Sequence, residues 1–552
     1  MKDFSKNNFI YNIINNDIIK NKYKIIHTRF SPEPNGYLHI GHIKSIYLNF
    51  SIAVNYNGKF NIRFDDTNPD HEKLKFINSI INDIKWLGCF NYEKVFYASN
   101  YFSQMYDYAI ELINKNLAYV DLLSKEEIKI YRGTLTTPGT NSPYRNQSKR
   151  DNLILFKEMR HGKFNQGAAC LRAKIDMKSP CLVMRDPVLY RIKYIHHHKT
   201  NNDWCIYPTY DFAHCISDAI EGITHSLCTS EFTENRKLYN WILKNISINH
   251  YPKQYEFAPL NLSYHVLSKR KLKILVNKKI VNGWDDPRMP TIAGLRRRGY
   301  TANSLIEFCK RVGVTKQNSL INTKLLEYCI NKELNINAPR IMAVINPVLL
   351  IINSLPKNYC MYISVPNHPN NPSMGKKNII LTREIYIDRA DFNEFYTKDF
   401  KKLTLFKKVK LRYSYVIKAY KVLKKNNKIS AIFCNHEQYK TNKNFKNEIS
   451  IIHWVSKKYS LPAEFRLYEN LFNLANVENK VNFISYINKN SLTVKYGFVE
   501  KNVKTNLNNT FQFEREGYFC LDKKYSGKLP IIFNRITNIK YNYKKANIKK
   551  LN

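Results

Sequence analysis

Closely spaced cysteine pairs are absent from this sequence. The 552 residues include 11 cysteines, but no two are arranged as Cys-x-x-Cys, and Cys205, Cys215 and Cys228 lie among apolar residues. Structural zinc sites and disulfide-rich folds depend on repeated close spacing of cysteines. We therefore expect inert, reduced thiols in a cytoplasmic protein, and no zinc site.

Long apolar runs are also missing. The longest, residues 341–355, is interrupted by Asn346, Pro347 and Asn353, which makes it too short and too broken to span a bilayer. Residues 1–24 contain acidic side chains and lack the apolar core of a signal peptide. The sequence therefore predicts no association with a membrane.

Acidic residues are scarce relative to basic ones. The chain has 44 Asp and Glu against 88 Lys and Arg, a formal net charge of +44. Such an excess favours a polyanionic partner such as nucleic acid. Lys, Asn, Ile and Tyr are also abundant at positions that look purely structural. A general bias in amino-acid usage can therefore account for part of the positive charge. A chain of this length is expected to hold roughly three to five domains.

Residues 32–42, Pro-Glu-Pro-Asn-Gly-Tyr-Leu-His-Ile-Gly-His, separate a short apolar segment from an amphipathic helix. A strand, a tight turn and a helix N-terminus in this order offer unpaired backbone N–H groups to phosphate oxygens. His39 and His42 share one helix face, where both can donate hydrogen bonds to a polyphosphate. Gly41 allows close approach of a flat ring. The two histidines also suit a structural role or half of a metal site, and the strand-turn-helix context favours a nucleotide.

The following segments alternate between strands and helices. Strands are predicted at residues 60–64 and 94–97, and helices at residues 73–87 and 101–116. Parallel β-α-β units give this pattern, and their ligands bind at the carboxyl ends of the strands. Asp65 follows one such end.

The alternation breaks at residues 117–199, which are polar and rich in turns. It resumes with a strand within residues 204–212, followed by a helix and a turn at residues 221–224. An insertion in a split nucleotide-binding fold explains this order. From residue 338 onward, short segments rich in Ile, Val, Tyr and Phe between Asn, Lys and Gly turns predict β-barrels. Residues 540–552 have the composition of a basic tail.

Residues 266–271 form a second motif, Val-Leu-Ser-Lys-Arg-Lys. A basic cluster of this kind is usually a solvated surface. After the second half of a nucleotide-binding fold, it also suits the binding of phosphate groups. Residues 292–334 are predicted to be helical.

The two motifs, in this order and on either side of an insertion, resemble the HIGH and KMSKS sequences of class I aminoacyl-tRNA synthetases. Within that class the chain resembles the glutaminyl-tRNA synthetases of bacterial type, from about residue 25 to residue 540. The stretches that carry this resemblance are residues 32–42, 63–69, 207–226, 283–300 and 511–522.

The resemblance implies an α/β plus β architecture, with a split Rossmann-type catalytic domain, an inserted acceptor-binding subdomain, a helical subdomain and two C-terminal β-barrels. The implied bounds are 1–24 for an N-terminal extension, 25–100 and 200–260 for the catalytic domain, 101–199 for the insertion, 261–338 for the KMSKS loop and helical subdomain, 339–540 for the anticodon-binding barrels and 541–552 for the tail.

The resemblance also implies an activity. The chain is expected to activate L-glutamine with ATP to glutaminyl-adenylate, releasing diphosphate, and to transfer it to the 3′-terminal adenosine of tRNA(Gln). Mg²⁺ is expected with the ATP because it bridges phosphate oxygens, and no protein side chain is assigned as a metal ligand. The family suggests a monomer.

Three alternatives remain open at this point. The closest is a glutamyl-tRNA synthetase with a barrel-type anticodon domain. A nucleotidylyltransferase would share the histidine motif but leave the barrels unexplained. A non-catalytic RNA-binding protein would bind tRNA without forming any adenylate.

By the same resemblance, the catalytic candidates are His39, His42 and Lys269, which can stabilise charge that develops on the phosphates. The ATP-site candidates are Glu33, Pro34, Asn35, His39, Ile40, Gly41, His42, Ile43, Lys44, Ser45, Thr229, Pro259, Leu260, Leu267, Ser268 and Lys269.

The glutamine-site candidates are Arg29, Asp65, Tyr210 and Gln254. A carboxylate suits the ammonium of the substrate, and a tyrosine hydroxyl can both donate and accept. A site that accepts from the side-chain NH₂ of glutamine would penalise glutamate strongly. Asp65 also suits a turn cap, and Tyr210 a position in the core.

The tRNA-contact candidates are Leu135, Glu234, Thr315, Lys316, Gln317, Asn318, Arg340, Lys402, Arg412, Gln512 and Arg515. Leu135 matches an apolar wedge that opens the first base pair, and it equally suits a packed leucine. The barrel residues match positions that bind unpaired anticodon bases at their edges.

Four positions depart from the family pattern. Leu267 replaces the methionine of the motif, a change that conserves shape. Pro259 stands where an arginine is expected, and Glu234 where an aspartate reads an acceptor-stem pair. Lys402 stands where arginine is usual, and a lysine cannot reproduce a planar two-pronged contact.

Overall fold

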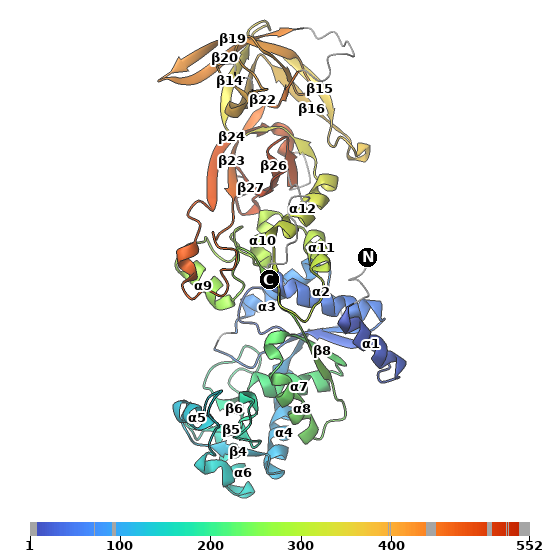
Figure 1. Cartoon of the computed structure of the whole chain (residues 1–552), viewed down its shortest axis with the longest axis vertical. Coiled ribbons are helices and arrows are strands. Elements are labelled where there is room, and N and C mark those ends of the chain that lie inside the picture. Colours follow the sequence, from blue (N-terminus) through green and yellow to red (C-terminus); the bar gives the residue numbers. More distant parts are fainter. Residues whose placement is uncertain are drawn as a thin grey trace. The chain divides into compact units, whose positions relative to one another are not determined.

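The computed structural model describes residues 8–70, 72–90, 95–395, 397, 399–437, 449–504, 510–525, 527 and 529–539. The predicted basic tail lies outside these residues. The chain divides into two compact units, Met1–Asn261 with Ile306–Ile321 and Leu262–Leu305 with Asn322–Asn552 (Figure 1).

The first unit is built on a parallel sheet. Strand β1 (His27–Phe30) pairs with β2 (Lys59–Phe64), and β2 pairs with β3 (Val95–Tyr97), both in parallel. Helix α2 (Ile40–Asn55) follows β1, and helix α3 (Leu74–Trp86) follows β2. The predicted β-α-β order is confirmed here.

A second pair of parallel strands lies beside β1. Strand β8 (His225–Thr229) pairs with β9 (Lys253–Phe257). The N–H of His27 donates to Thr224 Oγ1, and the N–H of Thr224 donates to His27 O, both at 2.9 Å. β1 and β8 are therefore neighbours at the point where the strand order reverses, which is where doubly wound folds bind ligands.

An antiparallel sheet with the order β4-β5-β6-β7 is inserted between the two halves. The strand predicted within residues 204–212 exists as β7, but it pairs with β6 and closes the inserted sheet, so the parallel sheet resumes only at β8. The order of a strand and a helix along the chain does not reveal which strand is the partner. The inserted strands are β4 (Ala118–Asp121), β5 (Cys170–Ala173), β6 (Val188–Ile192) and β7 (Ile206–Pro208).

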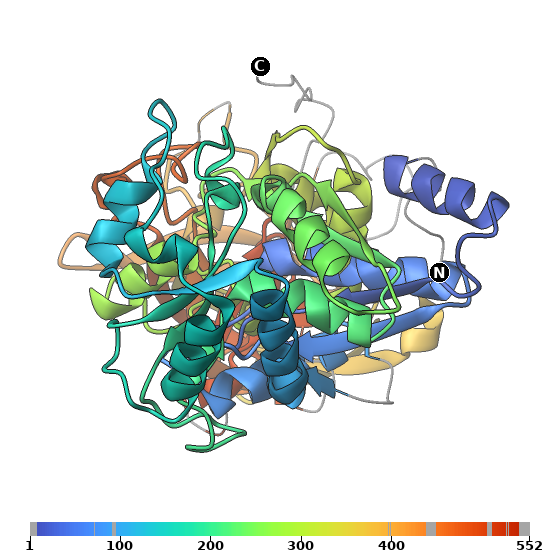
Figure 2. The same cartoon turned by 90° about the horizontal axis from the view of Figure 1, so that it is seen from below.

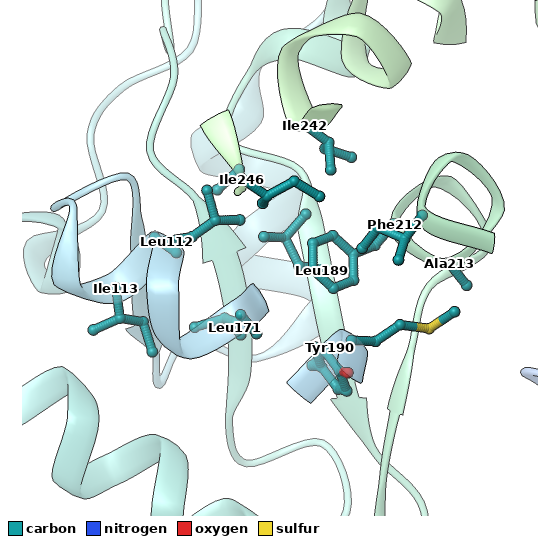
Figure 3. Close-up of a cluster of buried hydrophobic side chains, with 14 of the residues drawn as sticks. Leu112, Ile113, Leu171, Leu189, Tyr190, Phe212, Ala213, Ile242 and Ile246 are labelled. Carbon is teal, nitrogen blue, oxygen red and sulfur yellow. The ribbon is translucent and has the colours of Figure 1, made fainter. Parts of the chain in front are cut away.

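A hydrophobic core joins the inserted sheet to the helices around it. Figure 3 shows Leu112, Leu171, Leu189, Phe212 and Ile242 converging in this core, and each is completely buried. Burial of one such side chain contributes roughly 1.5–3 kcal/mol. These contacts hold α4, α7 and α8 against β5 and β6.

Helix α1 (Phe9–Ile19), dark blue in Figure 2, lies at one side of the first unit. Asp17 approaches His225 Nε2 at 3.3 Å and accepts from the Tyr255 hydroxyl at 3.5 Å. These contacts fasten α1 to β8 and β9. The other helices of this unit are α4 (Phe102–Asn114), α5 (Lys125–Arg132), α6 (Lys149–Arg160), α7 (Tyr210–Ile220) and α8 (Asn235–Asn245).

The second unit contains two seven-stranded sheets that nearly close into barrels. The first has the order β12-β25-β26-β27-β23-β24-β13, and its outermost strands, β12 (Arg340–Ile341) and β13 (Ala343–Val344), are one residue apart in the chain. The second has the order β21-β18-β19-β20-β14-β17-β22, and β21 (Ile451–Ile452) and β22 (Trp454–Ser456) are likewise one residue apart. The two outermost strands of each sheet therefore lie next to each other along the chain, so each sheet curls back on itself and nearly closes. The predicted β-barrels are confirmed.

The remaining barrel strands are β14 (Pro347–Ile352), β17 (Glu384–Asp388), β18 (Lys408–Leu411), β19 (Val416–Lys425), β20 (Lys428–Glu437), β23 (Ser460–Tyr468), β24 (Leu492–Glu500), β25 (Thr510–Phe513), β26 (Gly517–Leu521) and β27 (Ile531–Thr537). The helices of this unit include α9 (Lys269–Asn277), α10 (Ile292–Arg298) and α12 (Thr323–Asn337), while α11 (Ala302–Val312) contributes to both units. In the described part of the chain, no helix has the length and apolar character needed to cross a bilayer.

Candidate active site

Helix α2 begins in the first motif, with His39 as its N-cap. His39 Nδ1 accepts the N–H of Gly41 at 3.1 Å, and His42 Nδ1 accepts the N–H of His39 at 3.0 Å. The ring centroids of the two histidines are 3.8 Å apart. Because both Nδ1 atoms accept backbone hydrogen bonds, each neutral ring carries its proton on Nε2. Such N–H groups are the donors that a phosphate requires.

The loops at the carboxyl ends of the parallel strands hold several of the predicted ligand residues. Residues 33–35 follow β1, Asp65 follows β2, Thr229 ends β8, and Pro259 and Leu260 follow β9. The structure thus brings residues that are up to about 230 positions apart to one edge of the sheet, as the strand order predicts.

Helix α2 contributes both packing residues and a buried lysine. Ile40 and Ile43 are completely buried, so their side chains belong to the core. Lys44 is also buried, and its Nζ donates to Ala258 O at 2.8 Å. Burial lowers the pKa of Lys44 to about 8. Lys44 therefore ties α2 to the segment that precedes Pro259.

A buried ionic network surrounds Asp65. Arg63 Nε donates to Asp65 Oδ1 at 2.7 Å, and Arg63 Nη1 donates to Asp218 Oδ1 at 2.8 Å. Arg29 Nε donates to the same Asp218 oxygen at 3.1 Å. His214 lies between these groups, with Nδ1 at 3.4 Å from Asp65 Oδ2 and Nε2 at 3.6 Å from Asp218 Oδ2. None of the five side chains is more than 4% exposed.

The network holds its members in their charged forms. Burial by itself lowers the pKa of His214, but the charge of Asp218 outweighs it and raises this pKa to about 9. Burial disfavours ionisation of Asp218, but Arg29, His214 and Arg63 together hold its pKa well below the usual range. Arg63 likewise overcomes burial and lowers the pKa of Asp65. Asp65 is therefore a carboxylate at neutral pH.

Tyr210 lies against this network. Its ring stacks on His214, with centroids 4.9 Å apart and an interplanar angle of 22°. Burial raises the pKa of Tyr210 well above its usual value. Its hydroxyl is therefore neutral and can both donate and accept a hydrogen bond. The structure thus brings Arg29, Asp65 and Tyr210 together around His214 and Asp218.

Gln254 lies on β9, in register with Ser226 on β8. Ser226 Oγ accepts from Arg29 Nη2 at 2.6 Å, so Gln254 is one strand away from the network. The Gln254 amide donates to Phe232 O and to Glu256 Oε1, both at 3.0 Å. Gln254 is therefore near Arg29 but is held by neighbours of its own.

Two further side chains join this network: Glu221 Oε1 lies 3.4 Å from Arg63 Nη1, and the Tyr239 hydroxyl donates to Asp218 Oδ2 at 3.1 Å. The sequence interpretation named Arg29 and Asp65 and missed the other members, which are Arg63, His214, Asp218, Glu221 and Tyr239. Asp218 lies between the apolar residues Ile216 and Ile220 of helix α7, and a charged residue among apolar neighbours is a signal for a buried ion pair. The sequence does not reveal the partners of Asp218, because Arg63 is 155 positions and Arg29 is 189 positions away along the chain.

In the second unit, the basic motif leads into helix α9, which begins at Lys269. The N–H of Leu267 donates to Glu478 Oε2 at 2.6 Å. Lys271 donates to Glu478 O, and its Nζ lies 5.4 Å from the centroid of the Phe483 ring. The motif is thus fixed to residues 478–483 of the same unit, which follow the barrel strand β23.

Leu135 is 80% exposed, as a wedge requires, and it lies in a tight loop. Arg185 is buried, and its Nη1 donates to the carbonyl oxygens of Arg132, Thr134 and Thr137 at 2.8–2.9 Å. One guanidinium therefore holds the backbone on both sides of Leu135.

The other candidates of the first unit lie near its surface. Glu234 Oε2 accepts from the Cys181 thiol at 2.9 Å. Residues 315–318 are exposed, and Thr315 O accepts the N–H of Ala258 at 2.7 Å. The loop predicted to contact tRNA therefore touches the residue that precedes Pro259.

Three of the barrel candidates are held by acidic partners. Arg515 donates to both oxygens of the buried Asp391, at 2.8 and 2.7 Å, and Lys402 Nζ lies 2.5 Å from Asp391 Oδ1. Arg412 Nε lies 3.0 Å from Glu514 Oε1. Asp391 thus brings Lys402 and Arg515 into one cluster.

Arg340 and Gln512 face each other on β12 and β25. Arg340 is 7% exposed and donates to the backbone oxygens of Ala338 and Asn335 at 2.5 and 2.9 Å. In the free protein, Arg340 therefore supports the junction between α12 and the first barrel.

A parallel nucleotide-binding sheet split by an insertion, a histidine-capped helix at its centre and two β-barrels in the second unit define the architecture of a class I aminoacyl-tRNA synthetase. Comparison with known families agrees. Residues 25–336 match the catalytic domain of the class I tRNA synthetases (E and Q), and residues 338–437 and 451–522 match anticodon-binding domains of the same group. The chain belongs to this family.

Curated relatives named glutamine–tRNA ligase match almost the whole chain. The protein of Sodalis glossinidius is 56% identical over 97% of both chains. The protein of Cronobacter sakazakii is 55% identical over 97% of both chains, and that of Buchnera aphidicola subsp. Acyrthosiphon pisum (strain APS) is 54% identical over 100% of this chain and 99% of its own. The predicted resemblance is confirmed, and the chain is an aminoacyl-tRNA ligase.

Solved structures give a more distant likeness. A glutamate tRNA ligase from Elizabethkingia meningosepticum in complex with its amino acid is 18% identical, with a TM-score of 0.43, over 57% of this chain and 70% of its own.

Proposed function

We propose that this chain activates L-glutamine with ATP and transfers it to the 3′-terminal adenosine of tRNA(Gln). One observation carries the proposal: the 54–56% identity, over essentially the full length, to curated glutamine–tRNA ligases. These relatives do not favour the glutamyl-tRNA synthetase alternative.

The geometry of the first unit suits the chemistry of adenylate formation. The carboxylate of glutamine must attack the α-phosphorus of ATP, so the site has to align two anions and stabilise charge on the phosphates. The Nε2–H groups of His39 and His42 suit that task at the start of α2. On the basis of its motif, we assign to Lys269 of the second unit the role of a further positive charge in this reaction.

The amino acid binds to charged and neutral groups that the network keeps in fixed protonation states. The carboxylate of Asp65 receives the ammonium of glutamine, and the neutral hydroxyl of Tyr210 contacts its side-chain amide. A buried acceptor that faces the NH₂ of glutamine would be left against an oxygen of glutamate, which disfavours the wrong substrate.

Mg²⁺ accompanies the nucleotide in this proposal. Hard cations prefer oxygen ligands, and Glu33 is the only carboxylate among the predicted ATP-site residues. The predicted ATP-site side chains therefore suit the phosphate groups better than they suit Mg²⁺. The ion would be held mainly by phosphate oxygens. The protein works as a monomer in the cytoplasm, where its free cysteines stay reduced.

The test is an aminoacylation assay with glutamine and glutamate side by side on tRNA(Gln). We expect charging with glutamine, and a loss of at least about 100-fold in tRNA-dependent ATP–diphosphate exchange in Lys269→Ala. Lys278→Ala, at the exposed C-terminal end of α9, is the matched control and should keep its activity. Equal charging with glutamate would refute the proposed specificity.

A further inference from the structure

A buried carboxylate joins the two barrels of the second unit. Asp391 lies in the short turn that follows β17 of the second barrel, and its side chain is 1% exposed. It binds Lys402, from the segment between β17 and β18, and Arg515, from the turn between β25 and β26 of the first barrel. Residues 338–437 and 451–522 match anticodon-binding domains. The carboxylate therefore links cationic residues from both matched segments.

Asp391 holds one edge of the Arg515 guanidinium. Nη1 donates to Asp391 Oδ2 at 2.8 Å and Nη2 donates to Oδ1 at 2.7 Å, a parallel two-pronged contact that fixes orientation as well as distance. Nη1 also donates to Nδ1 of the buried His453 at 3.3 Å. Burial lowers the pKa of His453 to about 4, so its ring is neutral and can accept this bond.

A second edge of the same guanidinium has no hydrogen-bond partner among the described residues. Arginine has five N–H groups, and the three bonds to Asp391 and His453 use both groups on Nη1 and one on Nη2. The Nε–H and the remaining N–H of Nη2 are left, and they point in parallel from the adjacent edge of the planar group. Because the Arg515 side chain is 32% exposed, these two donors can reach a pair of acceptors on the edge of an unpaired base.

Lys402 completes the cluster as a point charge. Its Nζ lies 2.5 Å from Asp391 Oδ1 and donates to Ala390 O at 3.2 Å. A lysine has no planar fork of donors. Arg515 therefore carries the contact whose direction matters, and the carboxylate that fixes this direction is Asp391.

The backbone of Arg515 is specified as well. Arg515 is the middle residue of the turn between Phe513, which ends β25, and Gly517, which begins β26. Its φ is +68°, a left-handed conformation that is uncommon for a residue with a Cβ. Such conformations persist where the surrounding structure fixes them, often at ligand-binding sites. The two bonds to Asp391 are contacts of this kind.

We propose that Asp391 is a positioning residue for tRNA recognition: it holds one edge of the Arg515 guanidinium so that the other edge faces an unpaired base of the anticodon. Asp391 acts through Arg515 and touches no RNA itself. The proposal rests on the proposed function, in which tRNA(Gln) is a substrate.

The sign of one measurement separates this role from simple compensation of charge. Burial raises the pKa of Asp391, but hydrogen bonds from Arg515 and Lys402 outweigh it and lower this pKa, so the side chain is a carboxylate. A carboxylate that only lay beside two cations would weaken the attraction of the surface for RNA, and its removal would tighten tRNA binding. Loss of a positioning contact predicts weaker binding, although the net charge of the chain rises by one.

The experiment measures binding of tRNA(Gln) to the full-length chain at one fixed salt concentration. Asp391→Asn, which conserves size, should weaken binding at least about 10-fold, within the range of a two-pronged contact to a base. In the background of Arg515→Ala, the same change should alter binding by no more than about 2-fold, because the residue it acts through is gone. The second probe is tRNA(Gln) with its three anticodon bases replaced, for which Asp391→Asn should also change binding by no more than about 2-fold.

Asp286→Asn is the matched control. Asp286 is a buried carboxylate of the same unit that accepts from Nε and Nη2 of Arg288 at 3.0 and 2.8 Å, and neither residue is a tRNA-contact candidate. This variant loses a comparable pair and should bind tRNA(Gln) as the unaltered chain does. Arg515→Lys keeps the charge but not the fork, so it should weaken binding at least about 10-fold even where Asp391→Asn disturbs folding.

The proposal is overturned by unchanged or tighter binding of tRNA(Gln) in Asp391→Asn, by an equal loss in Asp286→Asn or with the replaced anticodon, or by full binding in Arg515→Lys. Aminoacylation by the unaltered chain is measured in parallel. A failure to charge tRNA(Gln) with glutamine would refute the proposed function, while the binding results would still decide the role of Asp391.

Discussion

At the scale of single residues, the first unit depends on charges that are buried and fully paired. Arg29 and Arg63 share Asp218, and Asp65, Glu221 and His214 complete the set of three cations and three carboxylates. Removing one partner from such a set leaves the opposite charge buried and uncompensated, which costs far more than the pair itself contributes. Asp218 is the member on which the two arginines converge.

We therefore expect Asp218→Asn to reduce the free energy of unfolding by about 3–5 kcal/mol, measured as a lower urea midpoint by circular dichroism. The matched control is Glu158→Gln, which breaks an exposed 3.0 Å pair with Lys163 and should cost less than about 1 kcal/mol. Equal effects of the two changes would show that the network contributes nothing special.

His214 gives a prediction about pH. Its pKa rises from about 6.5 in the unfolded chain to about 9 in the folded one. Because the folded state holds the proton more strongly, this contribution is complete below pH 6.5 and is lost as the pH rises through 9. Between these values the free energy of unfolding should fall by about 1.4 kcal/mol per pH unit from this group.

The measurement compares urea unfolding at pH 7, 8 and 9 in the unaltered chain and in His214→Gln. Lys44, whose burial lowers its pKa to about 8, contributes the opposite slope above pH 8 in both proteins. The difference between the two proteins therefore isolates His214. Parallel pH profiles would contradict the assignment of a charged His214.

At the scale of elements, helix α2 combines a structural cap with a chemical group. His39 caps the helix through Nδ1, and the Nε2–H of the same ring is the proposed phosphate donor. Asparagine is also a good N-cap, but it has no group that corresponds to the Nε2–H of the histidine ring. A single substitution can therefore separate the two roles.

His39→Asn should change the free energy of unfolding by no more than about 0.5 kcal/mol, measured from the thermal midpoint. Its tRNA-dependent ATP–diphosphate exchange should fall at least about 100-fold. His39→Ala removes the cap as well and should lose about 1 kcal/mol of stability in addition. Full exchange activity in His39→Asn would leave the ring with a capping role alone.

At the scale of the whole molecule, the charge of +44 predicts how tRNA binding responds to salt. Each phosphate neutralised by Lys or Arg releases counterions, so the logarithm of the binding constant falls linearly with the logarithm of salt concentration. If the excess charge acts as a broad basic surface, cognate and non-cognate tRNA should show the same steep slope and differ only by a constant offset. A shallow dependence of the binding constant on salt for both tRNAs would show that most of the excess charge does not contact tRNA and reflects only the composition of the chain.

The two parts of the candidate site differ in how much of each can be predicted from the sequence. The capped helix α2 was predictable because its signals, a strand, a turn and two histidines three residues apart, lie within 20 residues. Most of the network around Asp65 was not predictable, because Asp218 and His214 show no local pattern that names Arg29 and Arg63 as partners. Strand β7 was predicted, but its pairing with β6 was not.

The sequence by itself determined the family of this protein, the motifs of its proposed adenylate site and the presence of β-barrels, because each depends on residue types at short, fixed spacing. Only the tertiary structure decided which buried charges are paired and how the inserted sheet closes. The physical reason is that hydrogen bonds and ion pairs act over about 3 Å in space, and residues far apart in the chain reach that distance only when the whole unit folds.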